Sequence, residues 1–203
     1  MSEMPEDTGG AQVTAIPPDD VTSATSSRRT GILVLLGIVV AMVLVFVAAM
    51  SAKGRPTDGV LPADPVGYAA PALTLPRLDG KGPLTLADLK GKPVVVNFWA
   101  SWCTTCKAEA EALAAAEKKW RDKGVVFIGI DAQDTNPEAI AYEEKYGVEY
   151  LSVVDPSKAT SSTWRVTGFP ETFFIGPDGR IISKFISSID QTTLDEHIAQ
   201  IAS

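Results

Sequence analysis

The chain reads VVVNFWASWCTTCKAE over residues 94–109, and this stretch decides the fold. It opens with the run Val94–Trp99, which is apolar apart from Asn97, as expected of a strand buried inside a sheet. The chain's two cysteines follow as Cys103 and Cys106, where a helical pattern begins. A helix N-terminus favours negative charge, so it stabilises a thiolate. The stretch therefore predicts dithiol-disulfide exchange by these two cysteines.

Two other uses of a C-x-x-C pair fit the composition less well. A structural zinc site takes four ligands from cysteine and histidine, and beyond the two cysteines the chain offers one histidine, His197. A static disulfide at this separation would close a very short loop and would constrain the unfolded chain little. We therefore expect a redox-active disulfide with no metal and no other cofactor.

The composition describes one ordinary domain with attachments. The chain has 203 residues, of which 45% are hydrophobic and 21% are charged, and its net charge is -7. A surface this acidic argues against nucleic acid as a partner.

The attachments lie at the N-terminus. Residues 1–30 are rich in small and polar side chains and predict a disordered cytoplasmic tail. Residues 31–52 contain no charge and match the ~20 residues that a membrane-spanning helix needs, which predicts an uncleaved signal anchor. The alternative is a cleaved secretory signal, whose apolar core is shorter, about 7–15 residues. Closely spaced glycines and prolines predict a flexible linker over residues 53–67, which leaves residues 68–203 for the domain.

The orientation of the predicted span follows from the redox domain that it carries. Arg28 and Arg29 precede it and Lys53 and Arg55 follow it, so the positive charges are nearly balanced. A disulfide persists in an oxidising compartment. We therefore expect a single-pass protein of the cell membrane with its domain on the extracytoplasmic side.

Strand and helix patterns alternate from residue 68 onward, which indicates an α/β domain. The expected elements are extended pieces at 73–75 and 84–86, strands at 94–99, 125–130 and 150–154, helices at 103–123, 136–146 and 157–164, a hairpin of 172–175 with 181–185, and a final helix from 193. Asn136 and Thr193 are the expected helix N-caps.

A second motif, GFPETFFI at residues 168–175, completes a family pattern. With residues 94–109 it resembles the thioredoxin superfamily, and more narrowly the membrane-anchored TlpA/ResA/CcmG (DsbE) group of thiol-disulfide oxidoreductases. The likeness covers roughly residues 70–203. It implies a thioredoxin-like fold, in which helices flank a central mixed β-sheet and a central helical insertion lies near residues 136–154.

The resemblance also implies roles for the residues of the first motif. Cys103 would be the nucleophile at the exposed edge of the helix, and Cys106 would be the resolving thiol. Glu109 follows Cys106 by three residues on the helix stripe that faces the core. A buried acid there would have a raised pKa and could accept the proton of Cys106. The alternative is a solvated glutamate on the helix surface.

The second motif would complete a substrate-binding site. Pro170 would be cis and would leave the backbone of Phe169 free to pair with an extended substrate segment. Trp102 and Phe169 would form an apolar lip, although packing in the core is an equal alternative for both rings. Glu171 would be a second acid at the rim of the site.

One residue departs from the group. Thr105 stands before the second cysteine, where many members have proline. The residues between the cysteines tune the reduction potential, which among C-x-x-C proteins ranges from about -270 to about -120 mV. The direction of electron flow is therefore open.

Three functions compete at this point. The first is a reductant of apocytochrome c cysteines in cytochrome c maturation, supplied with electrons by a membrane thiol donor of the CcdA/DsbD type. The second is a general oxidant or isomerase of secreted proteins, and the third is a peptide-binding or chaperone module that makes no use of its thiols. A peroxiredoxin-type peroxidase is disfavoured, because Ala100 stands where its P-x-x-x-T-x-x-C pattern has threonine.

Overall fold

The structure is a computed structural model that describes residues 33, 35–45 and 60–203. Residues 35–45 are helical and exposed. Among the helices of the described residues, none combines the length and the apolar character needed to cross a membrane. The predicted tail and residues 53–59 of the predicted linker lie outside the described residues, as do residues 31, 32, 34 and 46–52 of the predicted span.

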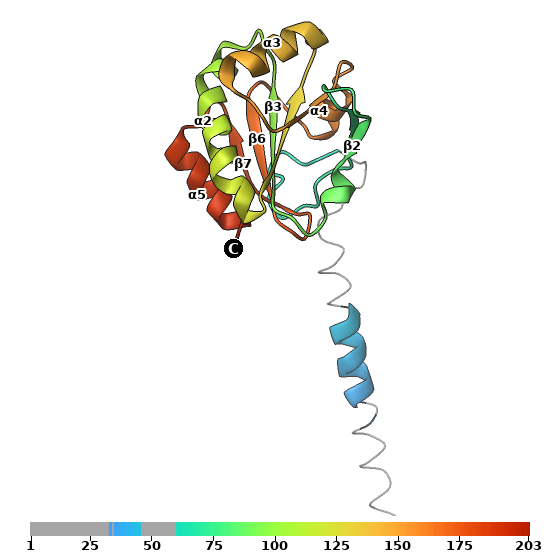
Figure 1. Cartoon of the computed structure of the whole chain (residues 1–203). Coiled ribbons are helices and arrows are strands. Elements are labelled where there is room, and N and C mark those ends of the chain that lie inside the picture. The colour runs from blue at the N-terminus through green and yellow to red at the C-terminus, as the bar shows by residue number, and fades with distance from the viewer. Residues whose placement is uncertain (1–32, 34, 46–59) are drawn as a thin grey trace, which may run out of the picture. The chain divides into compact units, whose positions relative to one another are not determined.

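A five-stranded mixed sheet forms the centre of the domain (Figure 1). Its strands lie in the order β5-β4-β3-β6-β7, with bounds Leu151–Val154, Val126–Asp131, Val94–Trp99, Glu171–Ile175 and Ile181–Ile186. The central strand β3 pairs in parallel with β4 and antiparallel with β6. Every residue of β3 is buried, because layers of side chains cover both faces of the sheet. This arrangement confirms the expected α/β class and the mixed sheet.

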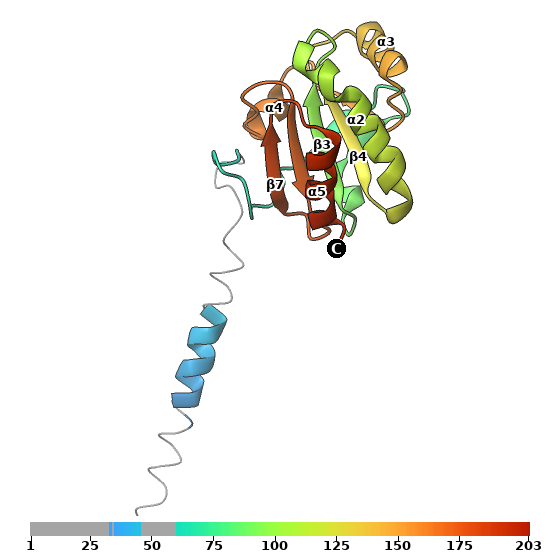
Figure 2. The ribbon, with the colours of Figure 1, turned by 90° about the vertical axis from the view of Figure 1, so that its left-hand side faces the viewer.

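Two helices cover one face of the sheet. Figure 2 shows α2 (Thr104–Trp120) and α5 (Gln191–Ile201) side by side across it. Between α2 and α3 (Asn136–Tyr146) the chain passes through the short helix η2 (Arg121–Lys123) and β4. The other face is covered by the hairpin of β1 (Thr74–Pro76) and β2 (Pro83–Thr85), by the short helix η1 (Leu86–Leu89) and by residues around α4 (Ala159–Thr163).

The alternation of side chains along β3 distributes them between these two layers. Val94, Val96 and Phe98 belong to the cluster under the β1-β2 hairpin. Val95 belongs to the cluster under α2 and α5, and Asn97 bonds a side chain of α2. The polar residue of the strand therefore faces the helix that carries the cysteines.

The helix ends show where sequence patterns mislead by a few residues. The last helix begins at Gln191, two residues before the predicted start, because Asp190 caps it by accepting the backbone N–H of Thr193. The helix 136–146 has the predicted bounds, but its N-cap is Thr135 and not Asn136. Thr135 has extended backbone and donates its own N–H to Glu138 at 3.1 Å.

The described domain begins inside the stretch expected to be linker. Leu61 is buried in the same cluster as Trp164, and its backbone N–H donates to the carbonyl of Thr163 at 3.0 Å. Gly67 in turn donates to the carbonyl of Ile181 at 2.8 Å. Residues 61–67 are therefore packed onto the domain, a contact that their glycine and proline content does not reveal.

One buried acid ends strand β4. Asp131 is almost fully buried, and its Oδ1 has no hydrogen-bond partner among the described residues. Burial first, and then the neighbouring Asp134, raise the pKa of the Asp131 carboxyl from 3.8 to about 8. The folded chain therefore holds one proton more than the unfolded chain between these two pH values, so this residue lowers stability progressively as the pH rises through that window.

Replacing this carboxyl by an amide should remove the pH-dependent loss. We expect Asp131→Asn to raise the free energy of unfolding by about 1–2 kcal/mol at pH 8, after allowance for solvent screening, and to change it little at pH 4. Urea denaturation at both pH values measures the difference. Asp122→Asn, at an exposed position, is the control. A loss of stability at pH 8 would show that the charged carboxylate is the stable form.

Candidate active site

The candidate site lies where the carboxyl end of β3 meets the amino end of β6. The two strands run antiparallel, and Phe98 near the end of β3 lies opposite Glu171 at the start of β6. The chain leaves β3 into Cys103, and it enters β6 from the Phe169-Pro170 bond, which is cis as the resemblance implies. Two motifs more than sixty residues apart in sequence thus meet at one edge of the sheet.

The two cysteines form a disulfide with a Cα–Cα distance of 5.3 Å. Cys106 is fully buried, whereas Cys103 is 6% exposed. The expectation that Cys103 lies exposed at the helix edge is therefore wrong for the disulfide form. Its sulfur lies 3.5 Å from the carbonyl oxygen of Phe169, so the loop before Pro170 covers most of it. Cys103 is nevertheless the more accessible of the two cysteines.

The sulfur of Cys103 caps helix α2. It accepts the backbone N–H of Cys106 at 3.1 Å, in the position where a hydroxyl or carboxylate usually stands. The hydroxyl of Thr105 lies 3.3 Å from the same sulfur and donates to the carbonyl of Phe169 at 3.2 Å. The backbone N–H of Cys106 therefore donates to the atom at which a thiolate would form, and the Thr105 hydroxyl lies within reach of the same atom.

Two aromatic rings border the cysteines. Trp102 is 57% exposed and meets the half-buried ring of Phe169 edge-on, with ring centroids 6.0 Å apart. The ammonium group of Lys158 lies 5.9 Å from the Phe169 ring. Trp102 thus lies on the surface and not in the core.

Glu109 lies one helical turn beyond Cys106 and is 1% exposed, which excludes the solvated alternative. Its carboxylate accepts the side-chain N–H of Asn97 at 2.8 Å and the backbone N–H of Ile189 at 3.0 Å. Burial raises the pKa of this carboxyl from 4.5 to about 7, although both hydrogen bonds favour the charged form and lower it. The group therefore changes its charge near neutral pH.

Three contributors to this site were missed by sequence reasoning. Asn97 donates its second N–H to the hydroxyl of Thr172 at 3.0 Å, and its polarity within an apolar strand was a usable signal. Tyr142, on α3, donates to the carbonyl of Cys106 at 2.9 Å and stacks on Trp99. The backbone N–H of Ile189 has no signature in the sequence.

Glu171 does not lie at the rim, which corrects the sequence prediction. It is 0% exposed, because β6 is an inner strand and its first residue already lies within the sheet. Its carboxylate pairs with the ammonium of Lys184 at 2.6 Å and accepts the backbone N–H of Thr167 at 2.8 Å. Glu171, at one end of the loop that carries Phe169 and Pro170, is therefore hydrogen-bonded to Thr167 at the other end.

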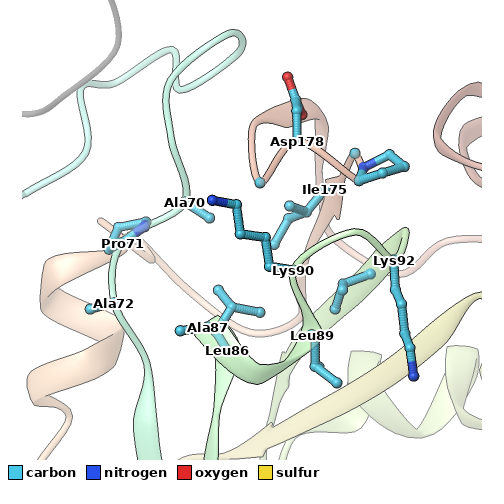
Figure 3. A pocket seen from close by; sticks show the side chains of 14 residues that line it. Ala70, Pro71, Ala72, Leu86, Ala87, Leu89, Lys90, Lys92, Ile175 and Asp178 are labelled. Carbon is cyan, nitrogen blue, oxygen red and sulfur yellow. The ribbon is translucent and has the colours of Figure 1, made fainter.

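An apolar hollow of the described domain lies away from the cysteines. It measures about 260 Å³ and is lined in part by Leu86, Leu89 and Lys90 (Figure 3). It also touches Val94 and Ile175, at the ends of β3 and β6 that are remote from Cys103. The cysteines therefore do not open into this hollow.

The comparisons with known proteins agree with this geometry. The family model described as the AhpC/TSA family matches residues 66–184. The thiol:disulfide interchange protein DsbE of Pseudomonas fluorescens biotype C is 37% identical over 140 residues, which are 68% of this chain and 76% of that protein. The thiol-disulfide oxidoreductase ResA of Bacillus anthracis is 30% identical over 136 residues, which are 67% of this chain and 78% of that protein.

Solved structures share the fold. A secreted Mycobacterium tuberculosis disulfide oxidoreductase homologous to E. coli DsbE superposes with a TM-score of 0.59 at 26% identity, covering 63% of this chain and 95% of that chain. A putative DsbE from Chlorobium tepidum superposes with a TM-score of 0.63 at 23% identity, covering 70% of this chain and 99% of that chain. The chain thus belongs to the AhpC/TSA family and, within its thioredoxin-like proteins, to the DsbE/ResA thiol-disulfide oxidoreductases.

Proposed function

We propose that this oxidoreductase is a membrane-anchored, extracytoplasmic reductant that keeps the paired cysteines of an apocytochrome c reduced for haem attachment. A membrane thiol donor of the CcdA/DsbD type would return it to the dithiol form. The observation that carries the proposal is the buried Glu109 one turn behind a C-x-x-C disulfide. The choice of apocytochrome c rests on the likeness to the TlpA/ResA/CcmG (DsbE) group, and the anchor rests on the apolar run 31–52.

The geometry supports a two-step exchange. The Cys103 thiolate attacks one sulfur of a substrate disulfide, which forms a mixed disulfide and releases the other substrate sulfur as a thiolate. Cys106 then gives its proton to Glu109 and attacks the Cys103 sulfur. This second step restores the Cys103–Cys106 bond and releases the second substrate thiolate, so two electrons have passed to the substrate. Trp102 and Phe169 would contact the substrate chain.

One observation favours an oxidant or isomerase of secreted proteins as a second candidate. Both Cys106 N–H and the Thr105 hydroxyl lie within reach of the Cys103 sulfur. Donors there stabilise the dithiol form through its thiolate, and a stabilised dithiol form makes a stronger oxidant.

Capture of the substrate tests the first candidate. In the Cys106→Ser variant the mixed disulfide on Cys103 has no resolving thiol, so we expect it to persist and to contain an apocytochrome c. Adducts are isolated from carbonate-washed membranes and identified by mass spectrometry. The double variant Cys103→Ser/Cys106→Ser, which should form none, is the control. A broad mixture of secreted proteins would favour the second candidate, and adducts only in the soluble fraction would contradict the anchor.

The reduction potential separates the same two candidates independently. For a reductant we expect a value near -250 mV or lower, whereas an oxidant would lie near about -120 mV. Equilibration with glutathione followed by thiol trapping measures it. The chain has no third cysteine to complicate the titration. Full cellular function of the Cys103→Ser variant would instead support the peptide-binding alternative.

Glu109→Gln tests the proton acceptor. We expect release of product from the mixed disulfide to slow by about 10²-fold at pH 7.5, because general bases contribute on this order. The inflection of this rate near pH 7 should also disappear. Stopped-flow fluorescence measures the rate.

A control and a second readout separate catalysis from structure. Glu111→Gln, on an exposed position of the same helix, should leave the rate and its pH profile unchanged. The raised pKa of Glu109 costs stability as the pH rises from about 4.5 to 7, so its replacement should flatten this dependence. Unfolding of the Glu109→Gln variant at every pH would show that the residue is needed for the fold instead.

A further inference from the structure

Thr105 occupies the position at which this chain departs from its group, and its hydroxyl lies between two functional atoms. Its Oγ1 is 3.2 Å from the carbonyl oxygen of Phe169 and 3.3 Å from the sulfur of Cys103. A hydroxyl carries one proton, so it donates to one of these two acceptors at a time. Proline, which many members of the group have here, could donate to neither.

The oxidation state of Cys103 decides which acceptor is better. A sulfur within a disulfide carries no charge and is a weak acceptor, so the Phe169 carbonyl accepts the hydrogen bond of the Thr105 hydroxyl. A donor dithiol passes two electrons to the S–S bond and becomes a disulfide. One of its protons goes to Cys106, which becomes a thiol, the other is released to solvent, and Cys103 is left as a thiolate. A charged acceptor forms hydrogen bonds roughly twice as strong as a neutral one. The thiolate therefore accepts the hydrogen bond of the Thr105 hydroxyl. Because Oγ1 already lies within reach of the sulfur, the hydroxyl needs only to rotate.

We propose that Thr105 is a positioning residue whose hydroxyl donates to the Phe169 carbonyl in the disulfide form and to the Cys103 thiolate in the dithiol form. The proposal deepens the exchange described above and is independent of the identity of the substrate. It links two events at one hydrogen bond. The reduced protein gains a stabilised thiolate, and the carbonyl beside Pro170 is released in the same state for an N–H group of an incoming extended peptide.

The surroundings leave this role to Thr105. The backbone N–H of Cys106 caps the same sulfur, but it is fixed by the helix and cannot turn toward Phe169. The side chain of Thr104, also exposed at the start of α2, has no hydrogen bond within the described domain. Four charged residues lie around this end of α2: Lys107, one turn beyond Cys103, Asp134, which accepts the backbone N–H of Ser101, Lys158 over the Phe169 ring, and Glu109 behind Cys106. A substitution at Thr105 changes none of them.

The test compares three substitutions in the full chain. In a Cys106→Ser background, where Cys103 is the single thiol, the pH dependence of alkylation by iodoacetamide gives the pKa of Cys103. We expect Thr105→Val to raise that pKa by about one unit, a tenfold loss of thiolate below it. Thr105→Ser keeps the hydroxyl and should titrate like its parent. Thr104→Val is the matched control and should also titrate like its parent.

The intact C-x-x-C pair provides a second readout. In glutathione buffer Thr105→Val should shift the equilibrium about tenfold toward the disulfide, which corresponds to ~30 mV. If the wild-type chain exchanges with glutathione while Thr105→Val matches it in both measurements, the role of Thr105 is overturned and the exchange activity stands. A Thr105→Ser variant that behaves like Thr105→Val would also overturn it, because a hydroxyl would then be insufficient. A wild-type chain that does not exchange would overturn both.

Discussion

The pairing of β3 with both a parallel and an antiparallel neighbour is the constraint on which the rest of the structure depends. The parallel partner requires a helical crossover, and that crossover begins with the helix that Cys103 caps. The antiparallel partner returns the chain to the same edge and places the Phe169-Pro170 bond against the cysteine sulfur. A strand with two parallel neighbours would send the second motif to the other end of the sheet, and the two motifs would not meet.

The same strand carries the polar residue that makes a buried acid tolerable. Asn97 and the backbone N–H of Ile189 offer two donors to Glu109 but no acceptor. The protonated acid would therefore leave its O–H without a partner there, while burial opposes the carboxylate. These opposing effects balance near neutral pH. A buried carboxyl group that is strongly favoured in neither its charged nor its neutral form is suited to receive a proton briefly and to release it again.

Sequence patterns predicted what depends on local periodicity and left out what depends on distant contacts. The strands, the α2 helix and the buried position of Glu109 followed from apolar spacing, and the predicted hairpin of 172–175 with 181–185 is the observed pairing of β6 with β7. The burial of Cys103 did not, because the covering atom is a carbonyl of Phe169 on another element. Glu171 was misplaced for a related reason: its burial depends on β7, whose Lys184 neutralises it.

The attachment of Leu61 has a mechanical meaning. Its side chain is buried with Trp164, and its backbone is bonded to Thr163. Tension applied along the chain from the N-terminal side therefore acts on the interior of the domain and not on a surface loop. The domain resists being peeled from that end until a leucine has been extracted from its hydrophobic cluster.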